Sequence, residues 1–399
     1  MNKTAIHIFN PEADYALAEF KESYTPPAPV VKLRRSLALT PLRFARPEDY
    51  ILLLDNPDTL LSDSPDKSDK QYKPTNTDKS NNSDKLYESD KLYESDKLDK
   101  SDELDKSDEL DKSDELDNSD NRIITPARFK EFFRKVSERS GEYEIRPWNW
   151  TPDLRHRLRL AGAPESLLPS DETLLRIREI ASRSTTIPFN EALNIRLSEK
   201  GLSKHISPLP LRFEDAEDAM GWWKKTGEKA FFKYPWSSSG RGVMLADLNL
   251  PAAKLKQWIA GGIRKQGYVM AETFFPKSID FATEWQITDG KASFIGLSLF
   301  SASENGNYIS NEVDSQSELL KIISGVAPDF NQEFIEAQRD SVDQVIAEIA
   351  PGYNGYAGID MMASANGRIR GGVELNFRMT MGIVALLENM SDEKRRNEN

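Results

Sequence analysis

The sequence contains no cysteine, few histidines and no long hydrophobic run. Without cysteine the chain has no disulfide, no thiolate nucleophile and no cysteine-based zinc site. Because the histidines are only His7, His156 and His205, we do not expect a histidine metal cluster or catalytic triad. The longest aliphatic stretch, residues 51–54, falls far short of the roughly 20 residues that span a bilayer. The apolar run near the N-terminus is too short for a signal peptide and predicts a β-strand, so we expect a cytoplasmic protein.

Net negative charge is also small outside one segment. Residues 83–118 are six tandem hexapeptides, from SDKLYE to SDELDN, and with Asp120 they carry −10 of the net charge of −12. The nearly neutral remainder gives no electrostatic reason to expect nucleic acid or an anionic membrane as a partner. One leucine per six residues buries too little apolar area to offset chain entropy. We therefore predict a disordered insertion over 56–121; a phosphorylation or interaction segment is the alternative.

The stretch 355–378 predicts two strands joined by a tight turn. Asn366-Gly367 between alternating apolar runs is typical of a type I′ turn, which needs positive φ at both central residues. Glu374, Asn376 and Arg378 are spaced two apart, so they share one face of the second strand. A carboxylate, an amide oxygen and a guanidinium on one face suit a hard cation that is bound to phosphate oxygens.

The pairing of Asp360 depends on the geometry of this turn. A two-residue turn places Asp360 opposite Val373, whereas a three-residue loop or a bulge at Gly371-Gly372 places it opposite Glu374. In the second case two carboxylates meet across the hairpin, which is unfavourable unless a cation lies between them. An exposed strand with solvated polar residues is the alternative interpretation.

Three upstream segments supply further candidates. Residues 230–235 predict a strand carrying Lys233, and the small residues of 236–242 form a loop whose backbone N–H groups can approach phosphate oxygens. This loop matches neither the Walker A pattern nor the Rossmann pattern. Residues 268–275 predict a strand carrying Glu272, and the strand over 280–286 follows it.

The order of these segments resembles the ATP-grasp superfamily over about residues 175–390. That family has a strand lysine, a glycine-rich flap, a hinge strand with glutamate, and a hairpin that ends in E-x-N-x-R. Phe377 stands where proline is commoner in the family. The second basic phosphate ligand of the family is not evident here, with Arg183 and Lys200 as candidates. The resemblance implies catalytic residues Arg378 and Lys233; nucleotide-binding residues Lys233, Ser237, Ser238, Ser239, Gly240, Arg241, Gly242, Glu272, Phe275 and Asp280; and metal ligands Asp360, Glu374 and Asn376.

The implied activity is ATP-dependent ligation with Mg²⁺ or Mn²⁺. A small-molecule or peptide carboxylate would be activated as an acyl phosphate, and an amine or similar nucleophile would then attack it, with release of ADP and phosphate. Two alternatives remain: a kinase or phosphotransferase on the same fold, and a non-catalytic nucleotide-binding module that engages a partner through the acidic repeat.

The predicted fold class is α/β, with ATP-grasp lobes of α+β type preceded by a small α/β domain. The expected divisions are an N-terminal α/β domain (1–55 plus 122–165), the disordered insertion (56–121), an N-lobe with the flap (166–265), a C-lobe with the metal hairpin (266–390) and a polar tail (391–399). Glu12 and Asp14 follow the first strand, where α/β folds place ligand-binding groups, so they are candidate substrate contacts. A loop that caps the next helix is the alternative.

Overall fold

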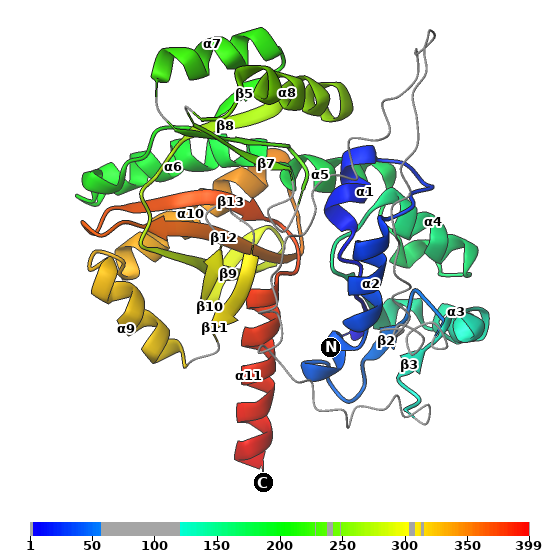
Figure 1. Cartoon of the computed structure of the whole chain (residues 1–399). Coiled ribbons are helices and arrows are strands. Elements are labelled where there is room, and N and C mark those ends of the chain that lie inside the picture. Colours follow the sequence, from blue (N-terminus) through cyan, green and yellow to red (C-terminus); the bar gives the residue numbers. More distant parts are fainter. Residues whose placement is uncertain are drawn as a thin grey trace, which may run out of the picture. The chain divides into compact units, whose positions relative to one another are not determined.

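The computed structural model describes residues 3–56, 120–227, 229–237, 242–247, 249–302, 308–312 and 315–398. The predicted insertion over 56–121 lies almost entirely outside these residues. In the described part of the chain, helices and strands are mixed and the strands form three sheets (Figure 1), which confirms the predicted α/β class. None of the described helices combines the length and apolar content needed to cross a membrane.

The first sheet is parallel and has the strand order β3-β2-β1-β4. Its strands are β1 (Thr4–Ile8), β2 (Tyr50–Leu52), β3 (Ile123–Ile124) and β4 (Tyr143–Pro147). Ile6 and Ile8 of the central strand are fully buried, and they share a core with Phe133 and Leu158. Burial of a central parallel strand on both faces explains why the N-terminal segment is a nearly continuous apolar run.

The second sheet is antiparallel and has the order β5-β8-β6-β7. Its strands are β5 (Leu211–Phe213), β6 (Ala230–Lys233), β7 (Val243–Ala246) and β8 (Val269–Thr273). Helices α7 (Ala216–Thr226) and α8 (Ala252–Gln266) contribute Met220, Leu255 and Ile259 to the core beneath it. Lys233 and Glu272 each lie on a strand, as the sequence predicts, and these two strands, β6 and β8, are adjacent in the sheet.

The third sheet is antiparallel and has the order β11-β10-β9-β12-β13. Its strands are β9 (Ile279–Thr288), β10 (Lys291–Ala302), β11 (Tyr308–Glu312), β12 (Gly355–Ala363) and β13 (Ile369–Asn376). Trp285 and Ile359 point into the largest apolar core, where helices α6 (Thr186–Glu199), α9 (Gln316–Val326) and α10 (Gln332–Ile349) also contribute side chains. By alternation and register, Glu284, Asp360 and Glu374 lie on the opposite face of the sheet.

The remaining elements connect these sheets. The other helices are α1 (Ala13–Glu19), α2 (Ala28–Ser36), α3 (Phe129–Ser137), α4 (Pro152–Leu160), α5 (Asp171–Ile180) and α11 (Met381–Glu398). Short 3₁₀ turns are η1 (Thr40–Arg43), η3 (Pro126–Arg128), η4 (Ser140–Glu142), η5 (Glu165–Leu167), η6 (Arg183–Thr185) and η7 (Ser203–His205). The segment predicted to be a polar tail, 391–399, is helical as far as Glu398, because α11 continues through it.

Candidate functional site

The β12–β13 hairpin places Asp360 directly opposite Glu374, so the predicted meeting of two carboxylates is confirmed. The predicted type I′ turn is wrong, and a three-residue loop, one of the alternatives, forms instead. Ser364 N donates to Arg368 O over 3.0 Å, which leaves a three-residue loop. Within the pair Asn366-Gly367 only the glycine has positive φ, at 76°. A type I′ turn needs positive φ at both residues, whereas one left-handed residue at the end of the loop suffices here.

Extra residues on β13 restore the pairing of the carboxylates. Met362 pairs with Arg370, and Asp360 pairs with Glu374, so β13 carries two more residues than β12 between these pairs. The irregular stretch includes Gly372, where an added Cβ would lie 2.5 Å from the Phe189 ring on α6. Glycine therefore allows β13 to pass close to α6 while its register shifts.

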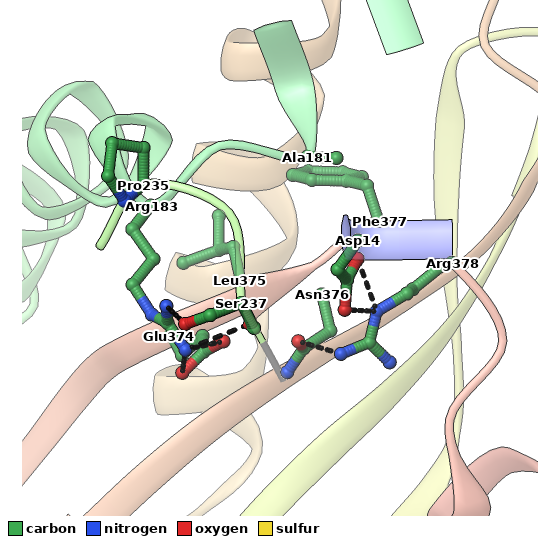
Figure 2. Close-up of a pocket in the computed structure, with 10 residues that line it drawn as sticks. All are labelled: Asp14, Ala181, Arg183, Pro235, Ser237, Glu374, Leu375, Asn376, Phe377 and Arg378. Carbon is green, nitrogen blue, oxygen red and sulfur yellow. Dashed lines mark hydrogen bonds and ion pairs between the residues drawn. The ribbon is translucent and has the colours of Figure 1, made fainter. Parts of the chain in front are cut away.

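Several side chains on this face are linked by polar contacts. Asn376 Oδ1 accepts from Arg378 Nη2 over 2.9 Å (Figure 2). Asn376 Nδ2 donates to Asp360 Oδ2 over 3.2 Å. Arg378 Nε lies 3.0 Å from Oδ2 of Asp14 on α1, so the two groups form an ion pair. Of the two acidic candidates after β1, Asp14 reaches this pocket, while Glu12 pairs with Arg34. Asp14 is thus not a helix cap, and its partner lies 364 positions along the chain.

Arg183 joins the same pocket from η6. Its Nη2 atom donates to both Glu374 oxygens, over 2.9 and 3.0 Å, and to Ser237 O over 3.1 Å. Its Nη1 atom donates to Tyr234 O over 2.7 Å and to Ser237 Oγ. Lys200, the other candidate for a second basic ligand, instead pairs with Glu336 over 3.2 Å. Of the two candidates, Arg183 is the one that lines the pocket.

Burial and like charges shift the proton affinity of these carboxyl groups. Burial raises the pKa of Asp360 well above its ordinary value, and the nearby Glu374 and Glu284 carboxylates raise it further. Burial also raises the pKa of Asp14, although the Arg378 guanidinium opposes this shift. The environment of this face therefore disfavours the ionised form of its carboxyl groups, and a bound cation would stabilise that form.

Glu284 was not anticipated from the sequence. It is fully buried on β9, where burial raises its pKa to about 7 despite hydrogen bonds from Ser298 Oγ, over 2.8 Å, and Thr380 Oγ1, over 3.2 Å. A Cβ at Gly358 would lie 2.7 Å from one Glu284 oxygen, and a Cβ at Gly382 would lie 2.1 Å from the other. The sequence signal was weak, because Glu284 is one of several polar residues in this strand and the second acidic one after Asp280.

Lys233 and Glu272 form a second group of charges. Lys233 Nζ pairs with Glu272 Oε1, and Arg370 of β13 lies 3.8 Å from the other Glu272 oxygen. The Arg370 guanidinium also lies 5.0 Å from the ring centre of Phe275. Asp280, by contrast, pairs with Lys277 at the start of β9, and it is not among the residues that line the pocket of Figure 2.

The predicted flap is only partly described. Ser237 lines the pocket, and Gly242 has φ of 70° and accepts a 2.7 Å hydrogen bond from Tyr234 N through its carbonyl oxygen. Ser238, Ser239, Gly240 and Arg241 lie outside the described residues, so their predicted role in nucleotide binding stays a prediction.

The donor set on the hairpin fits a hard divalent cation by its chemistry. Carboxylate and amide oxygens of Asp360, Glu374 and Asn376 are the ligand types that Mg²⁺ takes. Each Glu374 oxygen accepts one hydrogen bond from Arg183, and each keeps a further lone pair with which it can bind a cation. In the described part of the chain, no three His, Cys, Asp or Glu side chains cluster closely enough to hold a metal by themselves. The amide of Asn376 is thus an essential part of the proposed set.

Comparisons with known proteins give similarities of structure alone. No protein-family model and no curated protein sequence matches the chain. One similar structure is the biotin carboxylase domain of 2-oxoglutarate carboxylase from Hydrogenobacter thermophilus with MgADP, ADP and bicarbonate, at 14% identity and TM-score 0.42; the match covers 66% of this chain and 56% of that one. N5-carboxyaminoimidazole synthetase from Staphylococcus aureus with ADP matches at 11% identity and TM-score 0.37, over 63% and 68% of the two chains. D-alanyl-alanine synthetase A from Vibrio cholerae matches at 13% identity and TM-score 0.37, over 63% and 76%.

Proposed function

We propose that this protein is an ATP-grasp ligase that activates a substrate carboxylate with ATP and joins it to an amine. The observation that carries the proposal is the pairing of Asp360 with Glu374 across the β12–β13 hairpin, beside Asn376 and Arg378. Two paired carboxylates next to two arginines, in a largely buried pocket, suit a metal-bound phosphate better than they suit a purely structural strand.

The roles follow from the contacts. Asp360, Glu374 and Asn376 would hold Mg²⁺, which would neutralise charge on the transferring phosphoryl group. Arg378, whose Nη2 atom donates to Asn376, would stabilise charge on the same group through its planar fork of donors. Lys233, now paired with Glu272, would bind nucleotide phosphate. The segment 236–242 would exclude water, which otherwise hydrolyses an acyl phosphate.

The first experiment tests the nucleotide and the metal. ATP should raise the melting temperature of the wild-type protein only when Mg²⁺ or Mn²⁺ is present, because the metal links the phosphates to the hairpin. Glu374→Ala should abolish the rise. Glu336→Ala is the matched control, because Glu336 pairs with Lys200 and is outside the pocket. An equal rise in the presence of EDTA would contradict the metal assignment.

The second experiment tests the reaction. Amino acids, peptides and other carboxylates are supplied singly with MgATP and hydroxylamine. A ligase should release ADP and phosphate together, and hydroxylamine should trap the acyl phosphate as a hydroxamate of defined mass. A stable phosphorylated product without hydroxamate would favour a kinase. Tight MgATP binding without any turnover would favour a nucleotide-binding module.

A further inference from the structure

Two arginines line the pocket of Figure 2: Arg183 of η6, and Arg378, which follows the end of β13. An arginine has five N–H donors in a planar fork, one on Nε and two on each Nη atom. The number of these donors that protein acceptors already use therefore decides which guanidinium can bind a phosphate.

Protein acceptors use both ends of the Arg183 guanidinium. Its Nη1 atom donates to Tyr234 O over 2.7 Å and to Ser237 Oγ. Its Nη2 atom donates to Ser237 O over 3.1 Å and to the Glu374 carboxylate. The Nε atom is buried, and it has no partner in the part of the chain that the structure describes. Four of the five donors are thus in use, and the fifth is not exposed to a ligand.

Arg378 differs, because both of its Nη atoms keep a donor. Its Nε atom pairs with Asp14, Nη1 donates to Met379 O over 3.2 Å, and Nη2 donates to Asn376 Oδ1 over 2.9 Å. Among the described residues, each Nη atom therefore has one N–H left. The side chain is also 13% exposed, against 5% for Arg183. Of the two arginines, Arg378 is the one that can donate to phosphoryl oxygens.

The contacts of Arg183 instead join two parts of the site. Its backbone N–H donates to Pro235 O over 2.9 Å, so with the side-chain contacts four hydrogen bonds hold the segment 234–237, directly after Lys233. Its Nη2 atom lies 2.9 and 3.0 Å from the two Glu374 oxygens, and hence between them. This fixes the plane of the carboxylate and leaves the outer lone pairs for a cation.

We propose that Arg183 is a positioning residue that acts through Glu374. It orients this carboxylate and holds it against the segment 234–237, and it makes no contact with the nucleotide phosphates. This inference rests on the proposed function, in which Glu374 holds Mg²⁺. The resemblance to ATP-grasp enzymes makes Arg183 a candidate phosphate ligand instead, so the two roles can be tested against each other.

A double-mutant cycle separates the two roles. Calorimetry measures the affinity for ATP at saturating Mn²⁺ in the wild type, Arg183→Lys, Glu374→Gln and the double variant. Lysine keeps the charge, which suffices for a phosphate contact, but it lacks the fork that holds Glu374 and Ser237 together. Glutamine keeps one amide oxygen as a metal ligand, so binding remains measurable.

The two roles predict different results from this cycle. If Arg183 acts through Glu374, Arg183→Lys should weaken ATP binding about tenfold in the wild-type background, because a charged hydrogen-bond network is lost. In the Glu374→Gln background it should weaken binding by less than about twofold, because the carboxylate that it orients is already gone. Equal losses in the two backgrounds, or no loss in either, would refute the positioning role.

Lys200→Met is the matched control, because Lys200 pairs with Glu336 outside the pocket. This variant should bind ATP as the wild type does. If the wild-type protein itself binds no ATP with Mn²⁺, the proposed function is overturned and this inference with it. Failure of the cycle alone leaves the proposed function in place.

A second measurement does not depend on the folding of any variant. In a crystal structure of the wild-type protein with Mg²⁺ and a non-hydrolysable ATP analogue, the Arg183 Nη2 atom should remain between the Glu374 oxygens, while phosphate oxygens contact Arg378. Loss of the contact with Glu374, or a hydrogen bond from Arg183 to a phosphate, would overturn the positioning role.

Discussion

Two hairpins lie side by side in the third sheet, and they differ in the length of their loops and in the register of their strands. The β9–β10 hairpin turns through Asp289-Gly290, where both residues have positive φ, at 49° and 74°, and Thr288 pairs directly with Lys291. The β12–β13 hairpin turns through three residues and carries two extra residues on β13. The first has the regular two-residue geometry that matches the twist of the strands. The second departs from it, and the departure places Asp360 opposite Glu374.

The difference indicates what each hairpin is selected to do. Two hydrogen bonds to a neighbouring segment hold the loop of β9–β10. Asp289 N donates to Asn354 Oδ1 over 2.8 Å, and Gly290 N donates to Tyr353 O over 3.0 Å. Trp285 in its strand fills the core. The extra residues of β13 instead let its charged side chains point into a buried pocket. Bulges near functional sites commonly have this role. Changes in the first should alter stability, and changes in the second should alter chemistry.

The largest expected effect concerns Arg378 and turnover. Arg378→Lys keeps the charge but loses the planar fork that contacts Asp14 and Asn376, so ATP-dependent turnover should fall by at least about 100-fold. ATP affinity should change by less than about threefold, since the interaction is needed mainly in the transition state. The reverse exchange in the β9–β10 hairpin, Lys291→Arg, should leave turnover unchanged. Steady-state kinetics and nucleotide titration measure both; equal losses in the two variants would refute the distinction.

Glu284 sharpens the comparison, because it is a buried acid in the β9–β10 hairpin, opposite Gly296, where the register of β10 shifts by one residue. Its pKa in the folded protein, about 7, lies above its ordinary value of 4.5, so folding favours the protonated form. Its contribution to stability is therefore fully present below about pH 4.5 and is lost as the pH rises through about 7. Relative to Glu284→Gln, the wild type should lose about 2 kcal/mol of unfolding free energy between about pH 5 and pH 8. Urea denaturation of both proteins at each pH measures this, and a difference that is independent of pH would show that Glu284 does not titrate in this range.

The sequence predicted local features well where one turn or one strand decided them. Both residues of Asp289-Gly290 have the positive φ that this pair favours in a two-residue turn. The spacing of Glu374 and Asn376 places them on a shared face. Asn366-Gly367 carries a similar signal but forms a different loop. Its geometry depends on how β13 passes α6, which the turn residues do not encode.

Long-range partners could not be predicted from the sequence. The sequence gives Arg183 and Lys200 as candidates for the second basic ligand without distinguishing them, and only the fold brings Arg183 to Glu374. The place of Asp14 after the first strand suggested a ligand contact, but nothing near it in the sequence indicated Arg378. Such pairs depend on how the sheets approach one another, and this is set by core packing over the whole chain.

The smallest expected effect compares two asparagines that hold the two loops. Asn366 Oδ1 accepts from Ser364 Oγ over 2.6 Å and from Arg368 N over 3.2 Å, whereas Asn354 holds the loop at Asp289 from outside. Asn366→Ala and Asn354→Ala should each lower the unfolding free energy by about 1 kcal/mol, because each removes hydrogen bonds to a loop. Neither should change ATP-dependent turnover. The position of Asp360 opposite Glu374 is restored by the extra residues of β13 beyond the loop, so loosening the loop does not move the carboxylates. Denaturation curves and kinetics of both variants are the measurement. A loss of turnover in Asn366→Ala, at unchanged turnover in Asn354→Ala, would show that the loop itself sets the geometry of the carboxylates.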